Sequence, residues 1–138
     1  MDLLTSPIER LRTYKNLRYA VIFNPKIGIR CGYVELPDDI ALSHESIDVI
    51  QESLNFDQEL TFKGQHHALP FSELTVGWDH GHFGEGYDED SIREYNANAD
   101  TILQYLGPNE FPFATCDQVE EECKNFIDLF LNYVYIGF

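Results

Sequence analysis

The segment from Gly77 to Glu85 holds the residues of this chain that are best suited to chemistry. It reads Gly-Trp-Asp-His-Gly-His-Phe-Gly-Glu, so two histidines and two carboxylates lie within nine residues. The segment begins as a β-strand, in which alternate side chains share a face. Trp78, His80 and His82 would therefore point one way and Asp79 the other. Two histidines at positions i and i+2 can then reach one ligand, metal ion or partner.

A divalent metal ion is one candidate ligand. His80 and His82 offer imidazole nitrogens, and carboxylates lie nearby at Asp79, Glu85 and Asp88. These ligand types suit zinc, manganese or iron. The spacing matches no metal signature, because the chain has no His-Glu-x-x-His and no Cys-x-x-Cys. A metal-dependent hydrolase that uses Asp79, His80 and His82 is therefore a hypothesis, and the sequence itself identifies no cofactor.

A small nucleotide is a second candidate ligand. The glycine-rich stretch 81–86 follows a strand and precedes a helix, as an anion-binding loop does, although it lacks the Gly-x-Gly-x-x-Gly pattern. A cation and an aromatic ring from a neighbouring strand would complete such a pocket. The candidate ligand-binding residues are Asp79, His80, His82, Gly84, Tyr33 and Arg30.

Charge is distributed unevenly along the chain, and its net value is −15. Residues 1–30 carry six basic and two acidic side chains, a local charge of +4, whereas residues 31–138 carry three basic and twenty-two acidic ones, a local charge of −19. Such a field repels nucleic acid and attracts cationic surfaces. We therefore expect no direct binding of DNA or RNA, and a basic surface on a partner protein is the natural match.

Two acidic runs, together with Glu45, Asp48 and Glu52, could present carboxylates to such a partner. The candidate partner-binding residues are Asp88, Glu89, Asp90, Glu120, Glu121 and Glu122. Carboxylates in this arrangement would imitate the charge of a nucleic-acid backbone. The alternative for either run is a solvated helix face, which is the usual origin of such a pattern.

The composition predicts one folded domain over residues 1–138. A fraction of 43% apolar residues supplies one hydrophobic core at this length. No apolar run approaches the roughly 18 residues of a membrane span, and the first residues lack the layout of a secretory signal. We expect a soluble, intracellular protein without membrane contact. Three cysteines form no disulfide framework, so buried free thiols are expected.

The first half of the chain predicts mainly strands. The run Ser6-Pro7-Ile8-Glu9 has the form of a capping box, so residues 1–16 are expected to contain a short basic helix. Residues 18–86 should be a strand-rich part with one amphipathic helix at 43–54. The first two strands should form one hairpin and the last two should pair with each other. The expected strands lie at 18–24, 29–36, 60–62 and 74–80.

The second half, residues 88–138, predicts two helices. A capping box at Ser91 and apolar residues at helical spacing indicate the first, over 91–106. Thr115 caps the second, whose apolar stripe runs from 119 to 134 and whose glutamates at 120–122 should face solvent. Because strands precede helices, we expect an α+β fold: a mainly antiparallel sheet of about four strands, with two to four helices packed on one face.

Several short motifs occur together in a fixed order. They are Gly-Tyr-Val at 32–34, Leu-Thr-Phe at 60–62, the polar segment at 77–85 and an acidic helix at 119–123. In this the chain resembles a widespread family of small bacteriophage proteins of unknown function, whose polar segment reads Gly-Phe-Asp-x-x-His-x-Gly-Asp. Asp79, His82 and Gly84 align with that segment. The chain departs from the family at two places. It has Glu85 where the family has Asp, and Asp-Gln-Glu at 57–59 where the family has His-Gly-Gly.

The resemblance implies phage origin and action in the cytoplasm of a bacterial host, but it implies no reaction. Together with the charge it favours a protein that acts stoichiometrically by binding rather than by turnover. The leading hypothesis is an inhibitor of host defence, anti-CRISPR-like or of another kind, that occludes a basic nucleic-acid-binding surface. The alternatives are sequestration of a small nucleotide immune signal and the metal-dependent hydrolase. The sequence leaves open whether the chain forms a homo-oligomer.

Overall fold

The structure, a computed structural model, describes the backbone of residues 6–136 and the side chains of residues 6–135. Five strands form one antiparallel sheet in the order β1-β2-β3-β5-β4. The strands are β1 (Ile8–Tyr14), β2 (Leu17–Asn24), β3 (Ile29–Glu35), β4 (Phe62–Gly64) and β5 (Thr75–Asp79). The α-helices are α1 (Ile47–Leu54), α2 (Glu89–Tyr95), α3 (Ala99–Leu106) and α4 (Cys116–Leu131), with a 3-10 turn (Ala41–His44) before α1 and a π-helical turn (Asn132–Ile136) after α4. The predicted α+β class is confirmed.

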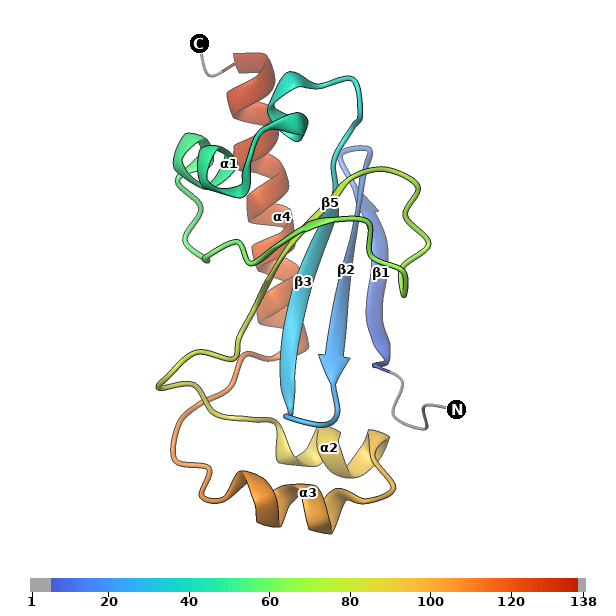
Figure 1. Cartoon of the computed structure of the whole chain (residues 1–138), viewed down its shortest axis with the longest axis vertical. Helices are drawn as coiled ribbons and strands as arrows, with labels where there is room; N and C mark the ends of the chain where they lie inside the picture. The colour runs from blue at the N-terminus through green and yellow to red at the C-terminus, as the bar shows by residue number, and fades with distance from the viewer. Residues whose placement is uncertain (1–5, 137–138) are drawn as a thin grey trace.

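The two faces of the sheet are covered differently. Helix α4 runs along one face with α1 beside it, and α2 and α3 lie beyond the end of the β2–β3 hairpin (Figure 1). The loop between β4 and β5 crosses the opposite face, where Leu69 and Phe71 pack on Ala20 and Ile22 of β2. Both faces of β2 are therefore buried, which is why its sequence is nearly all apolar.

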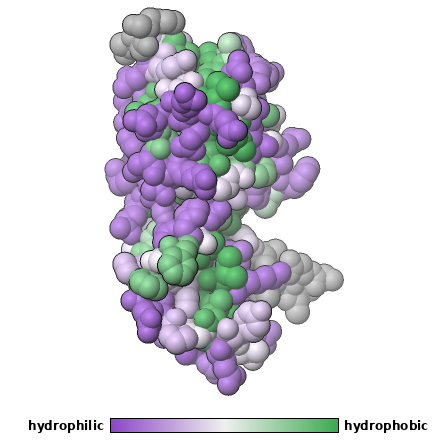
Figure 2. Space-filling view, turned by 60° about the vertical axis from the view of Figure 1, so that its left-hand side comes forward, coloured by the Kyte–Doolittle hydropathy of each residue, from purple (hydrophilic) through white to green (hydrophobic). Residues whose placement is uncertain are grey.

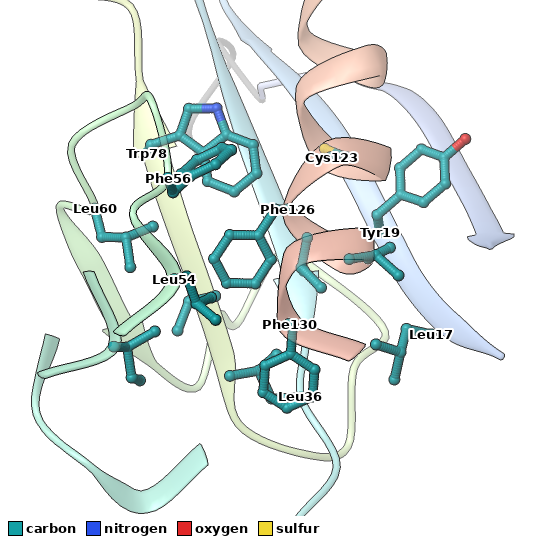
Figure 3. Close-up of a cluster of buried hydrophobic side chains, with 14 of the residues drawn as sticks. Leu17, Tyr19, Leu36, Leu54, Phe56, Leu60, Trp78, Cys123, Phe126 and Phe130 are labelled. Atoms are coloured by element: carbon teal, nitrogen blue, oxygen red, sulfur yellow. The ribbon is translucent and has the colours of Figure 1, made fainter. Parts of the chain in front are cut away.

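The main core lies between the sheet and α4. Alternate side chains of the strands point toward the helix, among them Tyr19, Val34 and Trp78, and they meet Phe126 and Phe130 of α4 (Figure 3). These five side chains are almost fully buried. At roughly 1.5–3 kcal/mol for each large apolar side chain removed from water, this layer is the main contributor to stability.

The predicted N-terminal helix is wrong, because residues 8–14 form strand β1. Lys15 and Asn16 both have positive φ, 49° and 69°, and make a two-residue turn into β2. Turns of that type match the twist of a hairpin, and asparagine tolerates the left-handed region. Pairing with β2 thus overrides the capping signals at residues 6–9.

The predicted single helix over 91–106 is also wrong, because this segment is broken into α2 and α3, so that residues 88–136 contain three α-helices. The break is at Asn96, which is buried and has extended backbone angles. Its side-chain amide donates to the carbonyl oxygen of Pro25 at 2.9 Å, and its side-chain oxygen accepts from the Asn98 amide at 2.9 Å. Asp88, rather than Ser91, caps α2.

Other predicted elements are present. The β2–β3 hairpin and the pairing of β4 with β5 are confirmed. Thr115 caps α4 through a complete capping box with Gln118, as its spacing predicted. The three cysteines are free thiols; Cys123 is buried and the other two are half-buried.

Candidate functional site

His80 follows the last residue of β5 and lies between two carboxylates. Its Nδ1 is 2.7 Å from Oε2 of Glu85, and its Nε2 is 2.8 Å from Oε1 of Glu122 on α4. Since carboxylates only accept, both ring nitrogens donate and the imidazole is cationic. The same Glu122 oxygen accepts a hydrogen bond from the indole nitrogen of Trp78 at 2.8 Å. Trp78 and His80 are two positions apart and point to the same face of the sheet, so the carboxylate of Glu122 accepts hydrogen bonds from both side chains.

We call His80, Glu85 and Glu122 the His80 trio. The two carboxylates explain why the imidazole of His80 is protonated. Burial lowers the pKa of His80, but the hydrogen bonds to Glu122 and Glu85 and their negative charges outweigh burial and raise the pKa to about 9. Only 8% of the His80 side chain is exposed. At neutral pH the trio therefore holds one positive and two negative charges, and its net charge is negative.

An open cleft of about 250 Å³ adjoins the trio. It is lined by the loop after β5, the loop before α4 and the first turns of α4, through His80, Gly84, Glu85, Pro112, Phe113, Ala114, Gln118 and Glu122. The backbone amide of Gly86 donates to the carbonyl oxygen of Pro112 at 2.9 Å, and the Asn109 side chain bonds both backbone groups of Tyr87. A Cβ on Gly86 would collide with the backbone of Phe111. The two loops are thus closely joined.

Each of these loops exposes a phenylalanine to solvent. Phe83 is fully exposed, and Phe111 is half exposed. Phe83 lies in a turn closed by the Glu85 amide, which donates to the His82 carbonyl at 3.1 Å, and Gly84 supplies the positive φ of +91° that the turn needs. Figure 2 brings this side of the molecule forward, with apolar surface gathered where the molecule narrows and a largely hydrophilic surface above it.

The sequence-predicted residues Asp79 and His80 point to opposite faces of the sheet, as the alternation predicted. Asp79 accepts hydrogen bonds from the Thr61 hydroxyl at 3.1 Å and from the Gly81 amide at 2.9 Å. His82 lies beyond the end of β5 and is exposed, so it does not continue the strand alternation. Within residues 6–135, no three His, Cys, Asp or Glu side chains are grouped so that they could hold a metal ion.

Arg30 and Tyr33 also lie on opposite faces. Arg30 points toward the α4 face, where it is buried between Glu9 at 2.6 Å and Asp88 at 2.9 Å. Tyr33 packs against the rings of Phe62 and His66 on the other face. Of the six candidate ligand-binding residues, only His80 and Gly84 line the same cleft.

The acidic run at 120–122 is largely occupied by internal contacts. Glu120 is 7% exposed and accepts from Arg12 at 2.8 Å, from Arg10 at 3.2 Å and from the Tyr19 hydroxyl. Glu122 belongs to the His80 trio, and Glu121 is exposed. The expectation that these glutamates all face solvent is wrong, because Glu120 and Glu122 flank the buried stripe of α4 and bind cations from the sheet.

The acidic run at 88–90 also contains one buried carboxylate and two exposed ones. Asp88 is buried, caps α2 through the Ser91 amide and pairs with Arg30. Burial would raise the pKa of Asp88, but its bonds to Ser91 and Arg30 lower it, so it stays ionised. Glu89 and Asp90 are exposed in the first turn of α2, where negative charge stabilises a helix.

A different acidic surface is free of internal partners. We call it the α1 acidic surface: Glu45, Asp48, Glu52, Asp57 and Glu59, all exposed and none in an ion pair within residues 6–135. The sequence has no lysine or arginine from residue 31 to residue 62. Asp48 and Glu52 lie four apart on α1, a spacing at which like charges destabilise a helix. Val49, between them, is 41% exposed.

The role of Glu122 as the acceptor for Trp78 and His80 was not predicted from the sequence. A signal for Glu122 was present, because position 122 lies three residues after Val119 and four before Phe126, on the buried side of α4. A strand that aims an indole N–H and an imidazole at that helix needs an acceptor there.

Comparisons with known proteins give no relative: no protein-family model, no curated protein and no solved structure matches this chain. Within residues 6–136, no helix is long and apolar enough to cross a membrane.

Proposed function

We propose that this protein acts stoichiometrically by binding, and that it covers a basic surface of a partner protein with the α1 acidic surface. The observation that carries the proposal is the internal use of its basic side chains. Seven of the nine lysines and arginines form ion pairs within residues 6–135. They neutralise carboxylates of other elements and leave the α1 acidic surface uncompensated.

The arrangement of the free carboxylates supports this role. Like charges at Asp48 and Glu52 cost helix stability, and an exposed valine lies between them. A basic partner would relieve the repulsion and cover the valine. Complementary charge also accelerates association and selects against acidic surfaces.

The kind of partner follows from the same charges. Spaced carboxylates on a helix and its following loop compete for cations that otherwise contact phosphates, so a nucleic-acid-binding protein is the favoured partner. The resemblance to small bacteriophage proteins favours a bacterial host protein, and inhibition of host defence, anti-CRISPR-like or of another kind, as the consequence of binding.

The test is capture of the partner from a bacterial lysate on the immobilised chain at low and high salt. We expect a captured protein that is released by salt and that loses nucleic-acid binding at a 1:1 ratio with this chain. The triple variant Glu45→Gln, Asp48→Asn, Glu52→Gln should release it. The matched control is Glu89→Gln, Asp90→Asn, Glu94→Gln on α2, which removes the same charge and should retain the partner. Equal loss in both variants, or capture that salt does not affect, would overturn the proposal.

A further inference from the structure

The cleft beside the His80 trio is not used by the α1 acidic surface, and it has features of its own. Its volume of about 250 Å³ is open to solvent and suits one long side chain rather than a large ligand. Glu122 and Phe113 are among its lining residues, so the cleft combines a carboxylate with an aromatic ring.

The floor of the cleft keeps one free acceptor. Oε1 of Glu122 is shared by Trp78 and His80, whereas its Oε2 has no hydrogen-bond partner within residues 6–135. Glu85 is also partly exposed, and its Oε1 has only a long contact of 3.4 Å to the His82 amide. The imidazolium cancels one of the two carboxylate charges. The cleft thus presents net negative charge, and the side chain of Gln118 adds a polar wall.

An aromatic ring lines the cleft together with the carboxylates. Phe113, in the loop before α4, is half-buried and lines the cleft with Glu85 and Glu122. The residue before it, Pro112, accepts a backbone hydrogen bond from Gly86, so the loop that carries the ring is tied to the loop after β5. A cation that enters the cleft could pair with Glu122 and lie against the Phe113 ring.

We propose that this cleft receives an arginine side chain of the partner protein. A planar guanidinium offers several donors to a carboxylate and stacks on aromatic rings, which a lysine ammonium does less well. The inference rests on the proposed function, because it assigns one contact of the same basic partner. It adds a second contact point, separate from the α1 acidic surface.

The test uses nuclear magnetic resonance of the full chain, titrated at neutral pH and low salt with N-acetyl-arginine amide. N-acetyl-citrulline amide, which has nearly the same shape without charge, is the control probe. We expect saturable shifts at the amides of Gly84, Glu85 and Gln118 with arginine and none with citrulline. Phe113→Ala should weaken binding by about fivefold, as expected for loss of a cation–π contact. Tyr105→Ala removes an exposed aromatic ring on α3, outside the cleft lining, and should change nothing.

The outcomes separate this inference from the proposed function. Shifts that do not saturate, or that are equal for both probes or both variants, would overturn the arginine site. If a partner is nevertheless captured in a salt-dependent way, the proposed function holds without it. If arginine saturates the cleft but no basic partner is captured, the proposed function fails while the cleft stays a guanidinium site.

Discussion

Nε2 of His80 and Oε1 of Glu122 lie 2.8 Å apart although 42 positions separate them in the sequence. This bond joins the end of β5 to the middle of α4 across the interface between sheet and helix. The partners come from elements that local pattern cannot place next to each other. The bond also makes the stability of the fold depend on the protonation of one imidazole.

The first prediction is a loss of stability in mildly alkaline solution. The pKa of His80 is raised from 6.5 to about 9, so its contribution is fully present below pH 6.5 and is lost as pH rises through 9. A shift of this size corresponds to about 3 kcal/mol. Urea unfolding between pH 6.5 and 8.5 should therefore show most of this decline in the free energy of unfolding, about 2 kcal/mol.

The control variants for this prediction are two single histidine changes. His80→Gln should flatten the decline, and His82→Gln should keep it, because His82 is exposed. At higher pH a second decline is expected from Cys31 and Cys116, since burial raises the pKa of each thiol to about 11. A slope in His80→Gln equal to that of the unchanged chain would contradict the assignment.

The second prediction concerns the buried ion pairs of Arg30. Arg30→Met leaves Glu9 and Asp88 without their cation, and loss of one member of a buried pair costs about 3–5 kcal/mol. Urea unfolding measures this cost. Arg93→Met, which breaks an exposed pair with Asp100, should cost less than about 1 kcal/mol. Equal effects would show that the buried network is not required.

The third prediction separates two neighbouring glutamates. Glu120→Gln weakens bonds to Arg10, Arg12 and Tyr19 and should lower the free energy of unfolding by about 1–3 kcal/mol. Glu121→Gln changes an exposed side chain, so thermal unfolding should not change measurably. If Glu120→Gln unfolds at the same temperature as the unchanged chain, the run at 120–122 is a solvated face after all.

The fourth prediction uses a glycine in the core layer. A Cβ on Gly32 would lie 2.6 Å from Cζ2 of Trp78, so Gly32→Ala should destabilise the protein by about 1–3 kcal/mol through overpacking. Trp78 is the only tryptophan, and its fluorescence should change in the folded state. At Gly84 an added Cβ meets open space, so Gly84→Ala strains the turn at its φ of +91° without touching Trp78, and the fluorescence should stay unchanged.

Local pattern predicted those parts of the fold that local interactions determine. Alternation placed Asp79 on one face and Trp78 and His80 on the other, and the Thr115 spacing predicted the start of α4. Pro25 and Gly28 mark the turn between β2 and β3. In each case neighbouring residues carry the information.

The rest depends on contacts between distant segments. The Ser6-Pro7 signal favoured a helix, but pairing with β2 and the ion pairs to α4 select a strand at 8–14. Glu120 and Glu122 belong to a charged run in sequence, yet the sheet supplies cations and donors for both. A count of charges cannot tell which carboxylates already have partners, so it named Glu45, Asp48 and Glu52 together with the two acidic runs and could not separate the α1 acidic surface from them.

The ion pairs between β1 and α4 bear on how the protein folds during synthesis. Arg10, Arg12 and Lys15 near the start of the chain find their carboxylates at residues 117, 120 and 128. Until the ribosome has released α4, these cations and the apolar face of β2 lack their partners. Contacts of such long sequence separation close late and slowly. The emerging chain should therefore stay sensitive to protease until α4 has left the exit tunnel, and then fold in one cooperative step.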